Sequence, residues 1–230
     1  MRYATNFLST TFILLIGGFL LVGTFAIPNA QAQIVLDVNS LSDDPDADTS
    51  DKVCATAAGE CTLRAALETV SNEDIQDRWV IEFDQIPTNL ENGRDVARIQ
   101  TGSQLDLLGS RVQIRGDTAP GWQAGDPPIV YIDGSTATGP STDGLELNVD
   151  ADTTSIIGLG IVGFPDDGIN ILGSSSGDIP LYNTIQYCWI GIEPDGSTNG
   201  NGFGASSFEQ GAGIDVNNLR GLTIGAMGNG

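Results

Sequence analysis

Short apolar runs separated by turn-forming residues fill the chain from about residue 95 onward. Several runs alternate strictly between apolar and polar residues, as in Leu145-Glu-Leu147 and Ile169-Asn-Ile171. Strict alternation places every second side chain on the same face of a β-strand. The pattern therefore predicts short strands and no further helix, over residues 112–114, 129–132, 145–149, 157–161, 169–171, 185–192, 214–216 and 222–224.

Two strands and one helix are predicted before residue 95. Apolar and polar residues alternate over 34–38, and 79–83 is a largely apolar run that Pro87 ends. Between them, apolar residues fall at the i, i+3, i+4 and i+7 positions of a helix face, with Thr62 available as the N-cap. These apolar residues are Leu63, Ala66, Leu67 and Val70.

A loose internal repeat links the predicted strands. Asp143-Gly-Leu, Asp167-Gly-Ile and Ala212-Gly-Ile each open a strand, and 24 residues separate the first two openings. This spacing is in the range of one coil of a solenoid, in which each coil buries its apolar residues by stacking on its neighbours. The predicted fold class is therefore all-β: a right-handed parallel β-helix (solenoid) with an N-terminal cap that contains one short α-helix.

A β-sandwich or a propeller of short strands is the alternative architecture. Either would need tight two-residue hairpins at regular intervals, and few such turns are visible in the sequence. In the β-helix, Ile157, Leu159 and Ile161 are expected to point inward together, with Gly158 and Gly160 on the outer face.

The first 32 residues have the pattern of a secretory signal peptide. Arg2 supplies the positive start, an uncharged apolar run covers 12–27, and Ala30-Gln-Ala32 provides the small residues of a cleavage site. An uncleaved anchor is the alternative, because residues 7–27 carry no charge and a spanning helix needs about 20 residues. Pro28 and the lack of a basic cluster after it favour cleavage. We therefore expect a secreted, extracellular or cell-surface protein.

The composition excludes several classes of function. The chain has 30 Asp and Glu against 9 Lys and Arg, and its net charge of −21 repels nucleic acid and anionic membrane surfaces. The one membrane contact expected is through the signal peptide before cleavage. The absence of histidine excludes a Ser-His-Asp or Cys-His site and a His-ligated zinc. Any catalysis would depend on carboxylates, arginines, tyrosines or a bound ion.

Two of the three cysteines are predicted to form a disulfide. Cys54 and Cys61 flank a short loop in a chain that is sent to an oxidising compartment. Cys188 lies inside the apolar run 185–192, where a packing role is more common than a reactive thiol.

An acidic loop is the candidate metal site. Asp44, Asp46, Asp48 and Asp51 offer hard oxygen ligands at alternating spacing, which could wrap a Ca²⁺ ion. No other cofactor is expected. The EF-hand pattern has glycine at its sixth position, where this loop has Thr49, and the alternative is a solvated acidic loop.

Paired carboxylates are the candidates for catalysis, and aromatic residues are the candidates for sugar binding. Asp166 and Asp167 could pair with Asp195 or Asp215, since glycoside hydrolysis needs two carboxyl groups about 5–9 Å apart. Asp and Gly are also expected at strand corners for turn geometry alone, so no catalytic residue is predicted. The aromatic side chains that could stack on sugars if they project outward are Trp122, Tyr131, Tyr187 and Trp189.

Residues 61–67, Cys-Thr-Leu-Arg-Ala-Ala-Leu, resemble the CSLREA module that opens many secreted bacterial β-helix proteins. They depart from it at Ala65, where the module usually has Glu. Residues 114–134 and 183–202 are similar to the first coil and to the recurring long-looped coil of those proteins. Residues 222–229 look like the start of another such unit.

The resemblance implies a division into three parts. These are a signal peptide at 1–32, a CSLREA-like cap module at 33–94 and coils at 95–230, in a natural protein that continues past Gly230. Proteins of this kind are mostly described as surface or adhesin-like. We expect a structural, adhesive or ligand-binding role without a catalytic centre, with a surface polysaccharide or another extracellular ligand as the partner. The alternative is an extracellular polysaccharide lyase or glycoside hydrolase.

Overall fold

The computed structural model describes most of the chain after the predicted signal peptide. The described residues are 33–71, 77–106, 108–148, 151–173, 182–202, 211–217 and 221–225. The chain divides into two compact units, residues 1–30 and 31–230, and all described residues belong to the second. The predicted signal peptide lies outside them, as do residues 226–229 of the stretch that resembles a further repeat.

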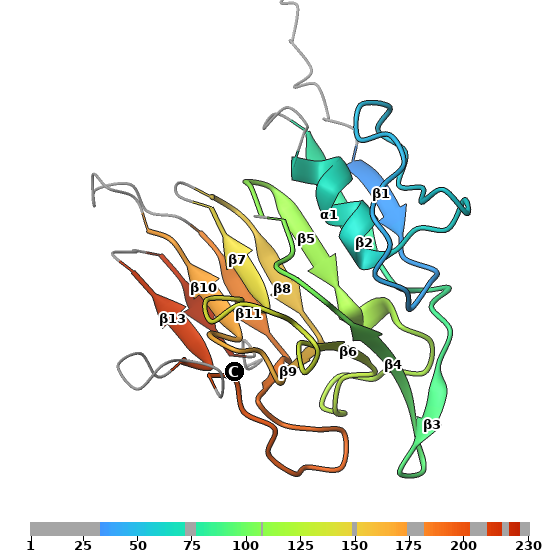
Figure 1. Cartoon of the computed structure of the whole chain (residues 1–230). Coiled ribbons are helices and arrows are strands. Elements are labelled where there is room, and N and C mark those ends of the chain that lie inside the picture. Colours follow the sequence, from blue (N-terminus) through green and yellow to red (C-terminus); the bar gives the residue numbers. More distant parts are fainter. Residues whose placement is uncertain are drawn as a thin grey trace, which may run out of the picture. The chain divides into compact units, whose positions relative to one another are not determined.

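Three β-sheets make up the described part of the chain (Figure 1). The first contains, in spatial order, β1 (Gln33–Asp37), β2 (Arg78–Glu82), β5 (Val112–Arg115), β8 (Ser155–Ile157), β11 (Thr184–Gln186) and β14 (Thr223–Ile224). The second contains β13 (Ile214–Val216), β10 (Ile169–Ile171) and β7 (Leu145–Leu147). The third contains β12 (Trp189–Ile190), β9 (Leu159–Val162), β6 (Val130–Asp133), β4 (Arg94–Gln100) and β3 (Asn89–Glu91).

Most neighbouring strands are parallel because the chain visits the sheets in turn. β7, β8 and β9 enter the second, first and third sheets, and β10, β11 and β12 then enter the same sheets in the same order. Each strand of the later set pairs in parallel with its counterpart in the earlier set. In Figure 1, β7, β10 and β13 accordingly lie side by side.

The predicted fold class, an all-β right-handed parallel β-helix, is wrong. The described residues form three sheets that are mostly parallel, one of which includes an antiparallel pair, together with one short α-helix and no uniform solenoid. The antiparallel pair is the hairpin of β3 and β4, which turns at Asn92 and Gly93 with φ angles of 50° and 83°. Two successive positive φ values suit a tight hairpin turn, and Asn-Gly is its usual sequence. The Asn92-Gly93 turn therefore joins two antiparallel strands where the solenoid prediction expects parallel ones.

The prediction that Ile157, Leu159 and Ile161 all point inward is also partly wrong. Leu159 and Ile161 are buried, but Ile157 is only half-buried and its neighbour Ile156 takes the buried position. Gly158 causes the change, because its φ of 68° bends the chain between β8 and β9 and shifts the alternation by one residue. The outward position predicted for Gly160 fits the structure. Gly160 is paired with Tyr131, whose ring lies on the face opposite to Val130 and Ile132, and a Cβ on Gly160 would lie 2.2 Å from that ring.

Aliphatic side chains stand in register across the sheets. In the first sheet, Leu36, Ile81, Ile114, Ile156 and Ile185 are paired in succession, and all are buried. The corresponding row in the third sheet is Ile99, Ile132, Ile161 and Ile190, and in the second it is Leu145, Ile169 and Ile214. The rows meet in one hydrophobic cluster, so each strand buries its apolar face against the strands before and after it.

The helix α1 (Leu63–Ser71) confirms the predicted helical spacing. The Thr62 hydroxyl oxygen accepts a hydrogen bond from the Ala65 backbone N–H at 3.0 Å, as expected of an N-cap. α1 lies beside β1 and β2 (Figure 1), and Leu63, Leu67 and Val70 belong to the hydrophobic cluster of the strands. The predicted disulfide joins Cys54 to Cys61, with a Cα–Cα distance of 5.1 Å. Within the described ranges, no helix has the length and apolar content needed to cross a membrane.

A matched pair of leucine substitutions tests the packing. Leu159→Ala should lower the free energy of unfolding by about 2–5 kcal/mol, because it leaves a cavity between strands that cannot collapse onto each other. Leu90→Ala should change it by less than about 0.5 kcal/mol, because Leu90 is 74% exposed. Urea denaturation of both variants gives the two values. Equal losses would contradict the assignment of Leu159 to the core.

The disulfide should stabilise the N-terminal part of the described chain. Replacing both Cys54 and Cys61 by Ser should lower the free energy of unfolding by about 2–3 kcal/mol, through the added freedom of the unfolded loop. The control is Cys188→Ser, which removes a free thiol and leaves the disulfide in place. Non-reducing peptide mapping should find Cys54 linked to Cys61, and a bond to Cys188 would contradict the pairing.

Candidate functional site

The structure does not gather the four aspartates of the predicted calcium loop. Among the described residues, a group of three carboxylates with oxygen atoms within 4.8 Å of one another occurs at Asp143, Asp166 and Asp167, and not in the loop. Asp44, Asp48 and Asp51 are exposed, and Asp46 is half-buried.

Three of the loop aspartates instead bind their own backbone. Asp46 Oδ1 accepts a hydrogen bond from the Asp48 N–H at 3.1 Å, Asp48 Oδ1 accepts one from the Ser50 N–H at 3.1 Å, and Asp51 Oδ1 accepts one from the Val53 N–H at 2.8 Å. These are local Asx turns. The hydrogen bonds from Ser50 also lower the pKa of Asp48. The aspartates thus shape the loop, and calcium binding by it stays a prediction.

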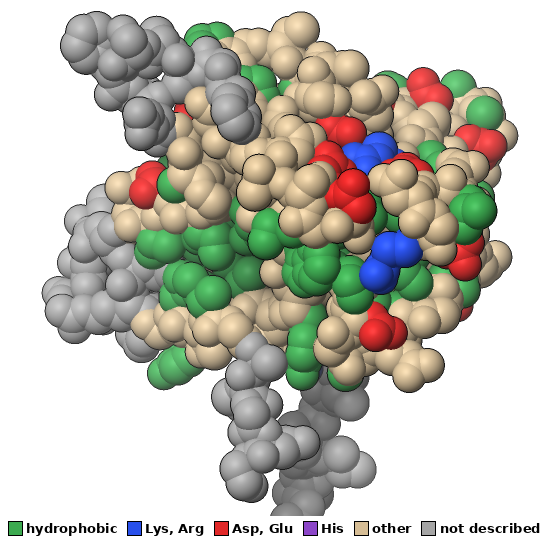
Figure 2. Space-filling model, turned by 90° about the horizontal axis from the view of Figure 1, so that it is seen from below, with side chains coloured by type: hydrophobic (Ala, Val, Ile, Leu, Met, Phe, Trp, Pro, Cys, Tyr) green, Lys and Arg blue, Asp and Glu red, His purple; other side chains and the backbone are tan. Residues whose placement is uncertain are grey.

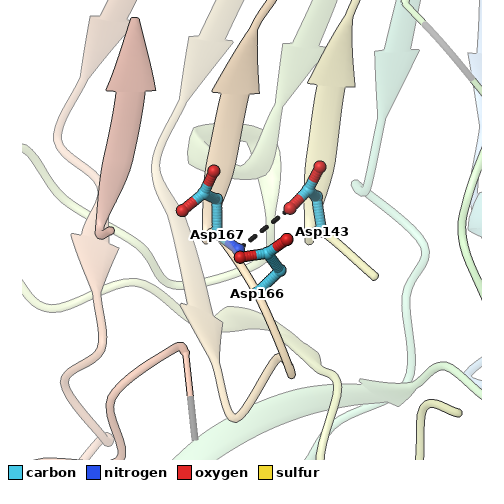
Figure 3. A group of neighbouring side chains, drawn as sticks. All are labelled: Asp143, Asp166 and Asp167. Atoms are coloured by element: carbon cyan, nitrogen blue, oxygen red, sulfur yellow. Dashed lines mark hydrogen bonds between the residues drawn. The ribbon is translucent and has the colours of Figure 1, made fainter. Parts of the chain in front are cut away.

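Asp143, Asp166 and Asp167 lie at the start of two neighbouring strands of the second sheet (Figure 3). Asp143 and Asp167 are the first residues of the sequence repeats that open β7 and β10, and both are buried. Parallel pairing of Leu145 with Ile169 brings the two openings together. Three carboxylates at this separation offer the oxygen ligands that a divalent cation prefers.

Hydrogen bonds from the backbone occupy much of this cluster. Asp143 Oδ1 accepts the Asp167 N–H at 2.9 Å (Figure 3), and its Oδ2 accepts a hydrogen bond from Asn170 Nδ2 at 3.0 Å. Asp167 Oδ1 in turn accepts the Ala212 N–H. On the preceding turn, Gln104 Oε1 accepts the Asp143 N–H at 2.8 Å. The side chains of Gln104, Asp143 and Asp167 therefore form a ladder in which each binds the backbone at the next strand opening.

The electrostatic environment of the ladder is strongly acidic. Burial raises the pKa of Asp167, and the charges of Asp143 and Asp215 raise it further, whereas the hydrogen bond from the Ala212 N–H opposes this. Burial and the charge of Asp143 also raise the pKa of Glu146. Protonation is therefore easier at this edge of the sheet than at an ordinary surface carboxylate.

The two carboxylates predicted as partners of this cluster have different positions. Asp215 lies on β13 opposite Asn170 of β10, and its charge acts on Asp167. Asp195 is placed elsewhere: its Oδ2 accepts a hydrogen bond from Asn92 Nδ2 at 3.3 Å, and its Oδ1 accepts the Ser197 N–H at 2.9 Å. The structure brings Asp215 toward the cluster and leaves Asp195 out of it.

Arg98 forms a second polar centre that was not predicted. Its guanidinium donates hydrogen bonds to Glu91 at 2.7 Å, to Asp133 at 3.0 Å and to Glu193 at 2.8 Å. The hydrogen bond to Glu91, most of all, and the one to Glu193 raise the pKa of Arg98, whereas burial opposes the rise. The guanidinium also lies 5.6 Å from the centre of the Tyr131 ring, a cation–π distance. Figure 2 shows a basic side chain surrounded by acidic ones on the face that it views.

The partners of Arg98 are 7, 35 and 95 residues away in the sequence. They become neighbours through the β3–β4 hairpin, the parallel pairing of β4 with β6 and the loop after β12. The one sequence feature that points to this centre is the scarcity of basic residues. In a chain with few bases, a half-buried arginine between Ala97 and Ile99 needs carboxylate partners, but their identity depends on the fold.

The four aromatic candidates separate into two groups. Tyr131 is fully buried and Trp189 is half-buried. Trp122 is half-buried and Tyr187 is 36% exposed, and their ring centres lie 5.7 Å apart in an edge-to-face arrangement. The two residues are 65 positions apart, so the sequence alone does not predict that they meet. They meet because β11 pairs with β8 and β8 pairs with β5, the strand that precedes the loop with Trp122.

Cys188 has the packing role predicted for it. The thiol is free and only partly exposed, and its sulfur lies 3.3 Å from the Gln186 carbonyl oxygen. Burial raises the pKa of the thiol to about 11, so it stays protonated at neutral pH and is a poor nucleophile.

Asp37 and Asp84 form a further carboxyl pair, which the sequence does not predict. Asp37, at the end of β1, has a pKa raised to about 6, first by burial and then by a hydrogen bond to Asp84 and by the charge of Asp84. Its Oδ1 is buried and has no hydrogen-bond partner among the described residues. Below a pH of about 6, the Asp37 carboxyl group is protonated and can share its proton with Asp84.

Removal of the Asp143 carboxylate should destabilise the turn between β9 and β10. Asp143→Ala leaves the buried Asp167 N–H without its acceptor, and the free energy of unfolding should fall by about 1–3 kcal/mol. Asp126→Ala, at an exposed aspartate, should change it by less than about 0.5 kcal/mol. Urea denaturation gives the free energy of unfolding of both variants. Equal values would show that the ladder does not stabilise the fold.

The Asp37 pair should make stability depend on pH. Because the folded-state pKa of about 6 exceeds the unfolded value of roughly 3.9, protonation stabilises the folded chain. This contribution is fully present below pH 4 and is lost as the pH rises through 6. An NMR titration of the Asp37 carboxyl carbon should give a midpoint near pH 6, and Asp84→Asn should lower it. A midpoint near pH 4 in the unchanged protein would contradict the shared proton.

Comparison with models of protein families, with curated proteins and with solved structures finds no match to this chain.

Proposed function

We propose that this chain is exported and acts outside the cell as a structural or adhesive protein that binds an extracellular glycan, without a catalytic centre. The observation that carries the proposal is the structural use of its best-placed carboxylates. Asp143 Oδ1 and Asp167 Oδ1 accept backbone N–H groups at the next strand openings, and Asp143 Oδ2 accepts the side-chain amide of Asn170 on β10. A carboxylate held in this way organises the backbone and has little capacity left for proton transfer to a substrate.

Three further features support an extracellular location. The sequence pattern of residues 1–32 is that of a cleaved leader. The Cys54–Cys61 disulfide suits an oxidising compartment. The net charge of −21 favours solubility and repels nucleic acid and anionic membranes.

The competing function is that of a carbohydrate-active enzyme, and one observation favours it. Asp143, Asp166 and Asp167 place carboxylate oxygens within 4.8 Å of one another, and the pKa of Asp167 is raised by burial and by its acidic neighbours. A protonated carboxyl group beside an ionised one is the arrangement of a general acid and its partner. This function would have to use Asp167 Oδ2 for proton transfer, because Oδ1 accepts the Ala212 N–H.

One experiment with the exported protein tests both functions. Mass spectrometry should find Gln33 at the N-terminus, and an intact Met1 in a membrane fraction would contradict export. The protein is then applied to a panel of neutral and acidic polysaccharides, with retention measured by affinity electrophoresis and released sugars by a reducing-end assay. We expect retention without products. Products that disappear in Asp167→Asn would instead establish the enzyme.

A further inference from the structure

We infer that a small pocket in front of Trp122 binds a neutral hexose unit of a glycan. This inference rests on the proposed function and names the site and the class of ligand. The pocket lies between the start of β4 and the loop that leads into β6, and its volume is about 200 Å³. Pockets for drug-sized ligands measure roughly 300–1,000 Å³, so this one suits a single ring.

The pocket combines an apolar wall with polar side chains. Trp122, Pro120 and Pro127 contribute apolar surface, and Arg94, Asp95 and Asp126 contribute charged groups. A sugar ring presents C–H groups on its faces and hydroxyl groups at its edge. Aromatic surface packs against the C–H groups, and ionised carboxylate and guanidinium groups form strong hydrogen bonds with the hydroxyl groups.

Trp122 is held in place by packing. The indole packs on the hydrophobic cluster of the strands, and the Tyr187 ring meets it at an interplanar angle of 70°. Its Nε1 is buried and has no hydrogen-bond partner among the described residues, so packing alone orients the ring. A wall that is fixed before binding loses little entropy when the ligand arrives.

The backbone of Tyr187 is unusual for a tyrosine. Its φ is 55°, in the left-handed region that favours glycine. Gln186 pairs with Ile157, so Tyr187 follows β11 at the position where Gly158, with a φ of 68°, follows β8. Glycine would adopt this conformation without strain, yet here the chain has the aromatic ring that contacts Trp122. Strained residues of this kind gather at ligand-binding positions.

The charges in the pocket select a neutral sugar. Arg94 is half-buried and forms no ion pair with any described residue, whereas Arg64, Arg98 and Arg115 are all paired with carboxylates. Its guanidinium is therefore available to donate hydrogen bonds to a ligand. Asp95 and Asp126 outweigh it in charge, and the whole chain carries −21, so a uronate or a sulfated sugar would be repelled.

The inference predicts a defined loss of affinity in single variants. Laminarihexaose, cellohexaose and mannohexaose are titrated into the exported protein by calorimetry, with hexagalacturonate as the acidic comparison. At least one neutral hexasaccharide should bind, and hexagalacturonate should not. Asp126→Asn should weaken binding about tenfold or more, as expected for the loss of a hydrogen bond to a charged group. Trp122→Ala should reduce binding at least as strongly.

Tyr187→Gly separates a binding role from a structural one. Glycine suits a φ of 55°, so the melting temperature should stay close to that of the unchanged protein. Affinity for the neutral sugar should fall by about threefold or more, because the Trp122 ring loses its contact with the Tyr187 ring. The controls are Tyr182→Gly, at a tyrosine that is 62% exposed, and Asp106→Asn, at an exposed aspartate; neither residue lines the pocket. Both should leave affinity unchanged.

The outcomes distinguish the inference from the function on which it rests. Binding that all pocket variants retain would overturn the pocket assignment and leave the glycan-binding function standing. Binding of hexagalacturonate in preference to the neutral sugars would overturn the class of ligand. No binding of any oligosaccharide or of the polysaccharide panel would overturn the proposed function itself.

Discussion

Aliphatic side chains stand in register between the parallel strands, and this register determines which face of each strand is buried. Ile81, Ile114, Ile156 and Ile185 stand opposite one another across four strands of the first sheet, and similar rows cross the other two sheets. Each strand is only a few residues long and could not bury its apolar face alone. A slip of one residue in any strand would turn its buried row outward, so register and burial reinforce each other.

The polar groups follow from this register. Once β7 and β10 are aligned by their leucine and isoleucine residues, Asp143 reaches the Asp167 N–H and Asp167 reaches the Ala212 N–H. The same alignment in the third sheet places Arg98 opposite Tyr131 and beside Asp133. The acidic clusters are thus consequences of strand stacking that also hold the turns in place. This double use accounts for the position of these carboxylates at the strand openings and beside Arg98.

Local sequence patterns predicted the elements better than their arrangement. The helix with Thr62 as its cap, the Cys54–Cys61 disulfide and the alternation at Leu145 and Ile169 depend on residues close together in the chain, and the structure confirms them. The fold class was wrong because the Asn92-Gly93 turn adds an antiparallel pair and the strands divide among three sheets.

Groups that depend on distant residues were the hardest to predict. Arg98 meets carboxylates from three separate segments, Asp37 meets Asp84, and Trp122 meets Tyr187. The sequence marked the opening residues of the repeats, Asp143 and Asp167, but not that their side chains bind the neighbouring backbone. That depends on the parallel register of β7 and β10 and on the glycine after each aspartate, since a Cβ at Gly144 would lie 2.4 Å from the Gly168 carbonyl oxygen.

Native-state hydrogen exchange can test whether the three sheets unfold as one cooperative unit. If the in-register rows hold the three sheets together as one cooperative unit, the amides of Ile114, Ile132 and Ile156 should exchange only through global unfolding, with one common free energy and one common denaturant dependence. Exchange of Ile132 in the third sheet at a much lower free energy than Ile114 and Ile156 in the first would show that the sheets open independently. That result would contradict a single cooperative unit held together by the in-register rows.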